Sequence, residues 1–284
     1  MIEVISSGLY SSIQDLGRFN YEEFGVPNSG NMDKFSSMLC NNLLKNKDCN
    51  PVMEITMTGP KLLFRNTTKI CITGADLSPK INNKSIEMNK VHNILEEDVL
   101  NFGKLNYGYR AYLGVKGGFI TDEIMGSRSM YYPITEKQKL KKGEVLFTKK
   151  LKTCDDYSNN KYIFNYEEHF KKKIIYVYPG PEFNKLNKKQ VINLTSSEFT
   201  ISNNNNRMAY QLNELFQNDI DPIISSLVLS GTVQLTPSGK LIILMRDNQT
   251  CGGYPRILQL SEESINRLSQ KHAGKKIKFQ IIDY

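Results

Sequence analysis

The stretch Arg246-Asp247-Asn248-Gln249-Thr250-Cys251-Gly252-Gly253-Tyr254-Pro255 gathers a cation, a carboxylate, amides, a hydroxyl, two glycines and a proline. It follows the apolar run 241–245, which predicts a buried strand, and it precedes a second apolar run at 257–260. Paired glycines permit positive φ angles and a close approach of backbone to a ligand, and the proline stiffens the exit. Polar groups at a strand end often mark a site. A tight hairpin loop has the same composition, so both interpretations stay open.

Strand signals extend outward from this stretch along most of the chain. The runs 69–73, 111–115, 174–178 and 223–235 are rich in β-branched and aromatic residues, and each predicts a strand. Turn sequences separate them: Thr58-Gly59-Pro60, Pro179-Gly180-Pro181 and Pro237-Ser238-Gly239. Many short strands at this spacing are typical of barrels or sandwiches.

Helical signals are few. Residues 32–44 place four apolar side chains near one helical face, with Ser29 or Asn31 as the expected N-cap. A second helix is predicted after Ser261 as N-cap, with acidic residues in its first turn and Gly274 as its end. We expect both helices to plug or flank β-barrels.

The chain divides at a polar segment rich in Asn, Lys and Tyr. We predict an N-terminal β-barrel subdomain at 1–150, a linker or insertion at 151–173, and a C-terminal β-barrel subdomain at 174–284. Asn50-Pro51 followed by Thr58-Gly59 is echoed by Asp221-Pro222 followed by Ser230-Gly231. The echo fits two related barrels in tandem.

The composition excludes several classes of protein. A chain of 284 residues with 39% apolar residues, and no apolar run near the roughly 20 residues that span a bilayer, is expected to be globular. Because no signal-peptide pattern is seen, a cytoplasmic location is expected. Five cysteines without a C-x-x-C pair, and three isolated histidines, argue against a disulfide framework and against a metal site. Although the net charge is +8, the lysines cluster without interleaved aromatics, so we interpret them as solvated surface and expect no nucleic-acid partner.

Three further clusters have residues suited to ligand binding. The first is Gln14-Asp15-Leu16-Gly17-Arg18 with Gly25-Val26-Pro27-Asn28-Ser29-Gly30-Asn31-Met32-Asp33, where N–H groups at a helix start would hold a carboxylate or phosphate. In the second, around Arg110 and Gly126-Ser127-Arg128-Ser129, guanidinium groups suit an anion. The third, Asn206-Arg207-Met208, could orient a carbonyl. Ordinary caps and surface arginines are the alternatives.

Taken together, these motifs resemble the KipA family, which is also known as the family of the C-type subunit of 5-oxoprolinase or as the allophanate hydrolase subunit 2-like family. Related sequences form part of the carboxyltransferase domain of urea carboxylase and urea amidolyase. The motifs that carry the resemblance are Gln14-Asp15-x-Gly17-Arg18, Gly25-Val26-Pro27-x-Ser29-Gly30-x-Met32-Asp33, Arg110-x-Tyr112-Leu113-x-Val115-x-Gly117-Gly118, Gly126-Ser127-Arg128-Ser129, Asn206-Arg207-Met208 and Asp247-x-Gln249-Thr250-x-Gly252-Gly253-Tyr254-Pro255. The resemblance runs from about residue 13 to about residue 279.

The chain also departs from the family pattern. Ala209 stands where glycine is usual, and Gln211 where arginine is usual. After Ser129, the family has a threonine and a glycine-rich segment, whereas this chain has Met130-Tyr131-Tyr132-Pro133-Ile134-Thr135-Glu136-Lys137-Gln138-Lys139. This difference implies altered specificity or reduced activity if the loop contacts substrate in relatives.

The resemblance implies a mainly β fold with two tandem cyclophilin-like β-barrel subdomains and a few short flanking helices. It implies that the chain is the C-type subunit of an ATP-dependent 5-oxoprolinase, opening 5-oxo-L-proline to L-glutamate together with a KipI-like B-type subunit and an A-type subunit. ATP with Mg²⁺ would bind on a partner or at a shared site. Phosphorylation of the lactam oxygen would create a leaving group and make attack by water feasible.

Site residues follow from the same motifs. The arginines would neutralise substrate charge, and the carboxylates would transfer protons or position a cation. The catalytic candidates are Asp15, Asp33, Arg246 and Asp247. The substrate-binding candidates are Ser29, Gly30, Arg110, Ser127, Arg128, Asn206, Arg207, Gln249, Thr250, Gly252, Gly253 and Tyr254.

Two alternatives remain open. Urea carboxylase relatives transfer a carboxyl group from carboxybiotin to an amide nitrogen, and biotin would then arrive on a partner because the chain lacks a Met-Lys-Met carrier sequence. KipA-type proteins resemble antagonists of a KipI-like kinase inhibitor, which would make this chain a non-catalytic binding protein.

Overall fold

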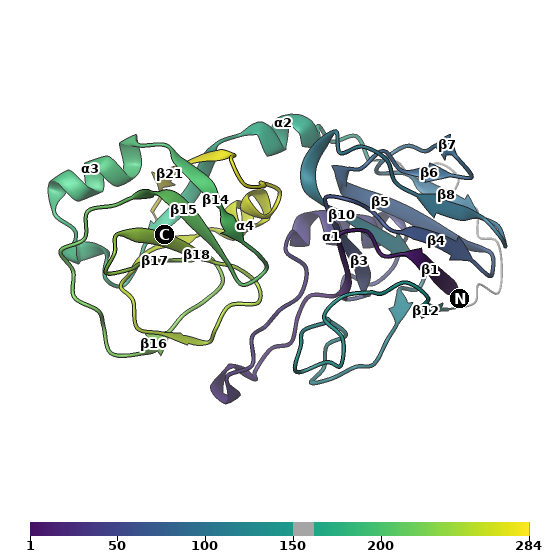
Figure 1. The fold of residues 1–284 in the computed structure, drawn as a ribbon, viewed down its shortest axis with the longest axis horizontal. Coiled ribbons are helices and arrows are strands. Elements are labelled where there is room, and N and C mark those ends of the chain that lie inside the picture. The colour runs from purple at the N-terminus through teal and green to yellow at the C-terminus, as the bar shows by residue number, and fades with distance from the viewer. Residues whose placement is uncertain (150–161, 284) are drawn as a thin grey trace. The chain divides into compact units, whose positions relative to one another are not determined.

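The computed structural model describes residues 1–149 and 162–283. This part of the chain is mainly β, which confirms the predicted class (Figure 1). The chain forms two compact units, Met1–Arg18 with Ser29–Phe170 and Phe19–Asn28 with Lys171–Tyr284. Residues 151–161 of the predicted linker lie outside the described residues, and its described end contains α2 (Tyr166–Lys171).

The first unit contains two β-sheets. One has seven strands in the order β11-β12-β1-β4-β9-β6-β7. Their bounds are β1 (Ile2–Ser6), β4 (Lys61–Phe64), β6 (Lys80–Ile81), β7 (Lys84–Ser85), β9 (Val99–Asn101), β11 (Phe119–Ile120) and β12 (Val145–Thr148). The other has five strands in the order β2-β3-β10-β5-β8. Their bounds are β2 (Tyr10–Gln14), β3 (Val52–Thr56), β5 (Thr68–Asp76), β8 (Val91–Ile94) and β10 (Tyr107–Val115).

The core of this unit combines side chains from both sheets. Val4 and Phe64 come from the seven-stranded sheet, and Ile55, Ile72 and Leu113 from the five-stranded sheet, and all are fully buried in one cluster. Strands β5 and β10 are buried along most of their length.

Helix α1 (Lys34–Leu43) packs against β5 and β10 of the five-stranded sheet. Cys40 and Leu43 of α1 form a second buried cluster with Cys71 of β5. The helix begins later than predicted: Asp33 is the N-cap, and its side chain accepts a hydrogen bond from Ser36 N at 3.0 Å. The expected caps at Ser29 and Asn31 belong instead to the preceding loop, because the chain turns into helical geometry only after residue 33.

The second unit is built around a closed barrel in the order β13-β20-β17-β18-β15-β14-β21, which confirms the predicted C-terminal barrel. The strands are β13 (Ile174–Pro179), β14 (Phe199–Asn205), β15 (Ala209–Leu215), β17 (Thr232–Leu235), β18 (Lys240–Leu244), β20 (Arg256–Leu260) and β21 (Lys276–Ile281). Strands β13 and β21 pair in parallel, and the other neighbours are antiparallel. A separate two-stranded ladder joins β16 (Ser226–Leu227) to β19 (Cys251–Gly252), so the run 223–235 forms two short strands rather than one.

Two helices accompany the barrel. A capping box between Asn187 and Gln190 starts α3 (Lys188–Ser196). Ser261 caps α4 (Glu262–Ser269) as predicted, accepting a hydrogen bond from Ser264 N. Helix α4 ends before the predicted stop at Gly274, which instead takes a positive φ in the following turn. The described residues also contain two 3₁₀ turns, η1 (Glu22–Phe24) and η2 (Phe183–Lys185).

Candidate functional site

Asp15 organises the first group of motif residues. Its Oδ1 accepts hydrogen bonds from the Ser127 and Ser129 hydroxyls, both at 2.7 Å, and from Gly17 N at 2.8 Å. Its Oδ2 accepts one from Arg128 N at 2.6 Å. A carboxylate that accepts several charge-assisted hydrogen bonds is strongly held. Asp15 therefore fixes the Gly-Ser-Arg-Ser loop against the turn after β2.

The loop before α1 lies against this turn. Asn31 N donates to Asp15 O at 2.8 Å, and Ser29 and Gly30 have φ angles of 55° and 86°. Gly30 is required here, since a Cβ at this position would lie 2.8 Å from Gly17 N. Ser29 and Asn31 are both 1% exposed, yet the Ser29 hydroxyl and the Asn31 side-chain carbonyl form no hydrogen bond among residues 1–149 and 162–283. Left-handed backbone and unsatisfied buried polar groups both concentrate at functional sites.

Behind this loop lies Glu54 of β3, a residue that the motifs did not identify. The side chain is fully buried, and its Oε2 accepts hydrogen bonds from Met32 N at 2.8 Å and from the Tyr112 hydroxyl at 2.9 Å. Asp33 N donates to the Tyr112 oxygen at 2.8 Å. Burial, followed by the charge of Glu54, raises the pKa of Tyr112 well above its usual value. A carboxylate inside the apolar strand Val52-Met53-Glu54-Ile55 was the available sequence signal.

The two candidate arginines of this unit differ in access. Arg110 is 3% exposed, and its Nε lies 3.7 Å from Glu54 Oε1. Arg128 pairs with Glu123 at 3.0 Å, with 30% of its side chain and 54% of that of Glu123 exposed to solvent. Arg110 thus compensates a buried carboxylate, whereas Arg128 has a solvent-exposed partner that an anionic ligand could replace.

In the second unit, two motifs distant in sequence are joined by Arg207 and Asp247. Arg207 Nε donates to Asp247 Oδ2 at 2.8 Å and Nη2 to Oδ1 at 3.1 Å, and Asp247 N donates to Arg207 O at 2.9 Å. Both side chains are buried. This bidentate pair fixes the loop after β18 to the turn between β14 and β15.

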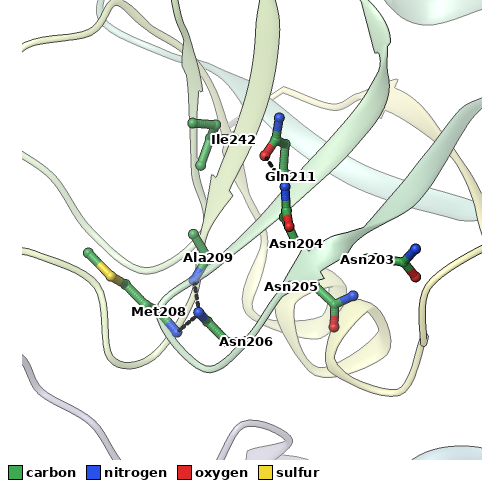
Figure 2. A pocket seen from close by; sticks show the side chains of 8 residues that line it. All are labelled: Asn203, Asn204, Asn205, Asn206, Met208, Ala209, Gln211 and Ile242. Carbon is green, nitrogen blue, oxygen red and sulfur yellow. Dashed lines mark hydrogen bonds between the residues drawn. The ribbon is translucent and has the colours of Figure 1, made fainter.

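The neighbouring candidates have separate partners. Arg246 pairs with Glu262 in the first turn of α4, with Nη1 to Oε2 at 3.2 Å, so its guanidinium is directed toward the helix. The Asn206 side chain accepts hydrogen bonds from Met208 N at 2.8 Å and Ala209 N at 3.1 Å, which stabilises the β14–β15 turn (Figure 2). Each of the four candidate arginines therefore has a carboxylate partner within the chain.

The remaining candidates form the loop that carries β19. Thr250 and Gly253 use their backbone carbonyls to accept hydrogen bonds from Val228 N and Ile223 N, both at 3.0 Å, while the Tyr254 side chain is 40% exposed. Neither glycine of the pair has a positive φ, contrary to expectation. Gly252 serves a different purpose, because a Cβ there would lie 2.4 Å from Gln234 Nε2.

A groove of ≈ 400 Å³ lies on the barrel at the β14–β15 turn. Amide side chains dominate its lining, as Figure 2 shows. The lining residues are Asn203, Asn204, Asn205, Asn206, Met208, Ala209, Gln211 and Ile242. Its volume lies within the range of roughly 300–1,000 Å³ that is typical of small-molecule sites.

The family model for "Carboxyltransferase domain, subdomain A and B" matches residues 24–281, most of the 284-residue chain. The chain belongs to this family. One relative is the C subunit of 5-oxoprolinase from Haemophilus influenzae, 28% identical over 288 residues that cover 99% of this chain and 91% of the relative. The urea amidolyase of Lachancea kluyveri is 43% identical over 130 residues, 45% of this chain and 7% of that protein.

The fold of this carboxyltransferase-family chain is also found in a solved structure. The crystal structure of the Kluyveromyces lactis urea carboxylase matches with a TM-score of 0.88 and 26% identity, covering 99% of this chain and 27% of that one. The chain thus corresponds to a minor part of these long enzymes.

Two negative observations apply to the part of the chain that the structure describes. No group of three or more His, Cys, Asp or Glu side chains there is arranged to hold a metal ion. No helix within residues 1–149 and 162–283 combines the length and apolar character needed to cross a membrane.

Proposed function

We propose that this chain is the C-type subunit of an ATP-dependent 5-oxoprolinase, acting with a KipI-like B-type subunit and an A-type subunit. The observation that carries this proposal is the match to the C subunit of Haemophilus influenzae 5-oxoprolinase, which covers 99% of this chain and 91% of that relative. The urea amidolyase match covers only 7% of its protein. The correspondence along nearly the whole chain favours a separate subunit of the oxoprolinase type.

The substrate would bind at the loops fixed by Asp15. 5-Oxo-L-proline has a carboxylate and a lactam, and the lactam carbonyl is a poor electrophile until its oxygen is phosphorylated. Arg128 is suited to bind either the carboxylate of 5-oxo-L-proline or the phosphate on its phosphorylated lactam oxygen. Its present partner Glu123 is exposed, so a ligand can replace Glu123 without leaving a buried charge unpaired. The Ser29 hydroxyl and the Asn31 side-chain carbonyl are a buried donor and a buried acceptor in the loop that packs against the Asp15 turn of the same unit.

ATP and Mg²⁺ bind, in this proposal, on a partner subunit or at a site shared with one. The contribution of this chain is to orient the lactam and to neutralise charge that develops on the phosphorylated intermediate. Preorganised donors of this kind contribute about 100-fold or more to turnover. Asp15 acts as a positioning residue, since its carboxylate oxygens are already occupied by Gly17, Ser127, Arg128 and Ser129.

The test is ATP hydrolysis dependent on 5-oxo-L-proline by this chain co-purified with its two partners. We expect glutamate and ADP in equal amounts, with turnover lost when this chain is omitted. Arg128→Ala should lower turnover about 100-fold while leaving the fold intact, because an exposed ion pair contributes at most about 1 kcal/mol. Arg65→Ala is the matched control, since Arg65 forms exposed pairs with Glu3 and Glu97 in the same unit.

Several results would count against the proposal. Unchanged turnover in Arg128→Ala would remove this residue from the substrate site. A stable complex that hydrolyses no ATP would instead favour regulation by binding, as a KipA-type antagonist of the KipI-like partner.

The 43% identity to Lachancea kluyveri urea amidolyase supports a second candidate, carboxyl transfer from a partner's carboxybiotin to an amide nitrogen. Its test is urea-dependent loss of the carboxyl group from carboxybiotin supplied on a carrier protein. Carboxyl transfer without 5-oxo-L-proline-dependent ATP hydrolysis would favour this activity over the first.

A further inference from the structure

The outer face of the seven-stranded sheet is apolar at positions where an antiparallel sheet usually carries polar side chains. In β12, Leu146 is buried in the core of the first unit, whereas Val145 and Phe147 are 47% and 54% exposed. Ile120 of β11 lies directly opposite Phe147 and is 44% exposed. Directly opposed residues on antiparallel strands place their side chains on one face. These three exposed side chains therefore form one apolar patch.

The strand register continues this patch across the sheet, in which β12, β1 and β4 lie side by side (Figure 1). Val145 lies opposite Glu3 of β1, and Glu3 lies opposite Leu63 of β4. Leu63 in turn lies opposite Val99 of β9, and both are half-buried. The charge of Glu3 is balanced by Arg65 at 2.8 Å. Together these positions form an apolar face, which consists of Ile120, Val145, Phe147, Leu63 and Val99.

Exposure of this apolar face to water is unfavourable in an isolated chain. Helix α1 packs against the other sheet, so it shields β5 and β10 rather than β12. The apolar face also reaches the edge of its own sheet, because β11 is the last strand and has only two residues. Contiguous exposed apolar area beside an open sheet edge favours association with another surface. The apolar face thus has the properties of a protein interface.

One end of the apolar face is bordered by lysines. Lys61, the first residue of β4, lies on the same face as Leu63, two positions later. Lys141 and Lys142 come just before β12, and they lie at the same end of the sheet because β4 and β12 both run antiparallel to β1. All three lysines are exposed, and none forms an ion pair within residues 1–149 and 162–283. These three residues form a lysine end that carries uncompensated positive charge.

Charge complementarity distinguishes between the occupants that could cover the apolar face. A second copy of this chain would bring a further net charge of +8 and the same lysine end, so electrostatic repulsion opposes self-association. A lipid surface would match the lysines, but Glu3, in the middle of the face, would then meet anionic headgroups. A protein whose apolar surface is bordered by carboxylates matches both the face and the lysine end.

We propose that the apolar face and the lysine end form the surface at which this chain binds a partner subunit, whose own surface is apolar and bordered by Asp and Glu side chains. The inference rests on the proposed function only for the existence of separate partner subunits. Phe147 and Ile120 supply the apolar contact area that becomes buried. The lysines speed association and fix the orientation of the partner.

The test is a binding titration of the full chain with its separately purified KipI-like B-type subunit and, in parallel, with its A-type subunit. We expect Phe147→Asn to weaken binding of one of them about 30-fold or more, since an apolar side chain in the interface is replaced by an amide. Ile192→Asn is the matched control, because Ile192 is 64% exposed on α3 of the other unit, and it should leave binding unchanged. Thermal unfolding verifies that each variant keeps the fold.

Charge reversal tests the lysine end. Lys141→Glu combined with Lys142→Glu should slow association with the same subunit about tenfold, and the remaining rate should depend less on salt concentration. Lys188→Glu combined with Lys189→Glu is the matched control, since both lysines are exposed on α3, and it should change neither quantity.

Several outcomes would overturn the docking surface. These are partner binding that Phe147→Asn leaves unchanged, or no binding to either subunit. A dimer of this chain that Phe147→Asn converts to a monomer would assign the face to a second copy instead. Binding of phosphatidylserine-containing vesicles that Phe147→Asn abolishes, in place of partner binding, would assign it to a lipid surface.

Failure of the docking surface and failure of the proposed function are distinguishable. Partner binding through the apolar face, in an assembly that never hydrolyses ATP with 5-oxo-L-proline, would overturn the oxoprolinase proposal and leave the docking surface intact. Turnover that requires the same partner concentration with Phe147→Asn as with the parent chain would do the reverse.

Discussion

Arg207 and Asp247 are forty positions apart in sequence and form a buried bidentate ion pair, with Nε–Oδ2 and Nη2–Oδ1 distances of 2.8 and 3.1 Å. A backbone hydrogen bond from Asp247 N to Arg207 O at 2.9 Å reinforces it. The pair joins Asn206-Arg207-Met208 to the loop that begins at Arg246. The two family motifs of the second unit are therefore held together as one structural element. This contact explains why one motif contains Arg207 and the other contains Asp247.

Breaking this pair should destabilise the protein strongly. Arg207→Ala leaves the carboxylate of Asp247 buried without its cation, and we expect a loss of about 3–5 kcal/mol in the free energy of unfolding, measured by urea denaturation. Lys173→Ala is the control, since Lys173 forms an exposed pair with Glu198 in the same unit and should cost at most about 1 kcal/mol. Similar losses in the two variants would contradict a structural role for the Arg207–Asp247 pair.

The paired glycines should tolerate alanine unequally. A Cβ on Gly252 would lie 2.4 Å from Gln234 Nε2, whereas one on Gly253 meets its nearest atom, Ile223 O, at 3.5 Å. Gly252→Ala should cost about 1–3 kcal/mol in the free energy of unfolding, because its Cβ would overpack against the buried Gln234 side chain. Gly253→Ala should remain within about 0.5 kcal/mol of the parent. Chemical denaturation of the two variants side by side makes the comparison, and an equal effect would argue against close packing at Gly252.

These glycines also illustrate what sequence could predict. The strands were predictable because their apolar runs are local, and Ser261 was predictable as a cap because its hydrogen bond reaches only three residues ahead. The roles of Glu54 and Gln234 were not predictable, since each depends on partners brought together by strand register. The φ angles at Gly252 and Gly253 were mispredicted for the same reason: close packing against a distant side chain, rather than local turn geometry, requires glycine at 252.

Glu54 should stabilise the loop before α1 through its charge. In Glu54→Gln, Arg110 loses the carboxylate beside it, and one of the hydrogen bonds from Met32 N and Tyr112 is weakened. We expect a loss of about 3–5 kcal/mol in the free energy of unfolding and faster amide hydrogen exchange at Met32 and Asp33. Glu96→Gln, at an exposed position in the same unit, should change neither quantity. Unaltered exchange at Met32 would show that Glu54 does not hold the loop.

Lys271 should make stability depend on pH in the alkaline range. Burial, followed by the nearby charges of Arg267, Lys275 and Lys173, lowers its pKa from 10.5 to about 8. Below pH 8 the Lys271 amine is charged in both the folded and the unfolded chain. The cost of burying this charge then lowers the free energy of unfolding by its full amount. Between pH 8 and 10.5 the unfolded chain binds more protons than the folded one, and this group therefore makes the free energy of unfolding rise with pH.

Replacing Lys271 with an uncharged residue removes the cost of burying its charge and the pH dependence that this residue gives to the free energy of unfolding. Lys271→Met should be more stable than the parent at pH 7 by up to about 3 kcal/mol, and the difference should shrink steadily as pH rises from 8 toward 10.5. Urea denaturation of parent and variant at pH 7, 9 and 10 measures the difference directly, while other groups that titrate in this range cancel. Lys189→Met on the exposed face of α3 is the control and should give a constant, small difference. A gap between Lys271→Met and parent that stays constant or widens across this range would show that Lys271 is charged in the folded protein at these pH values.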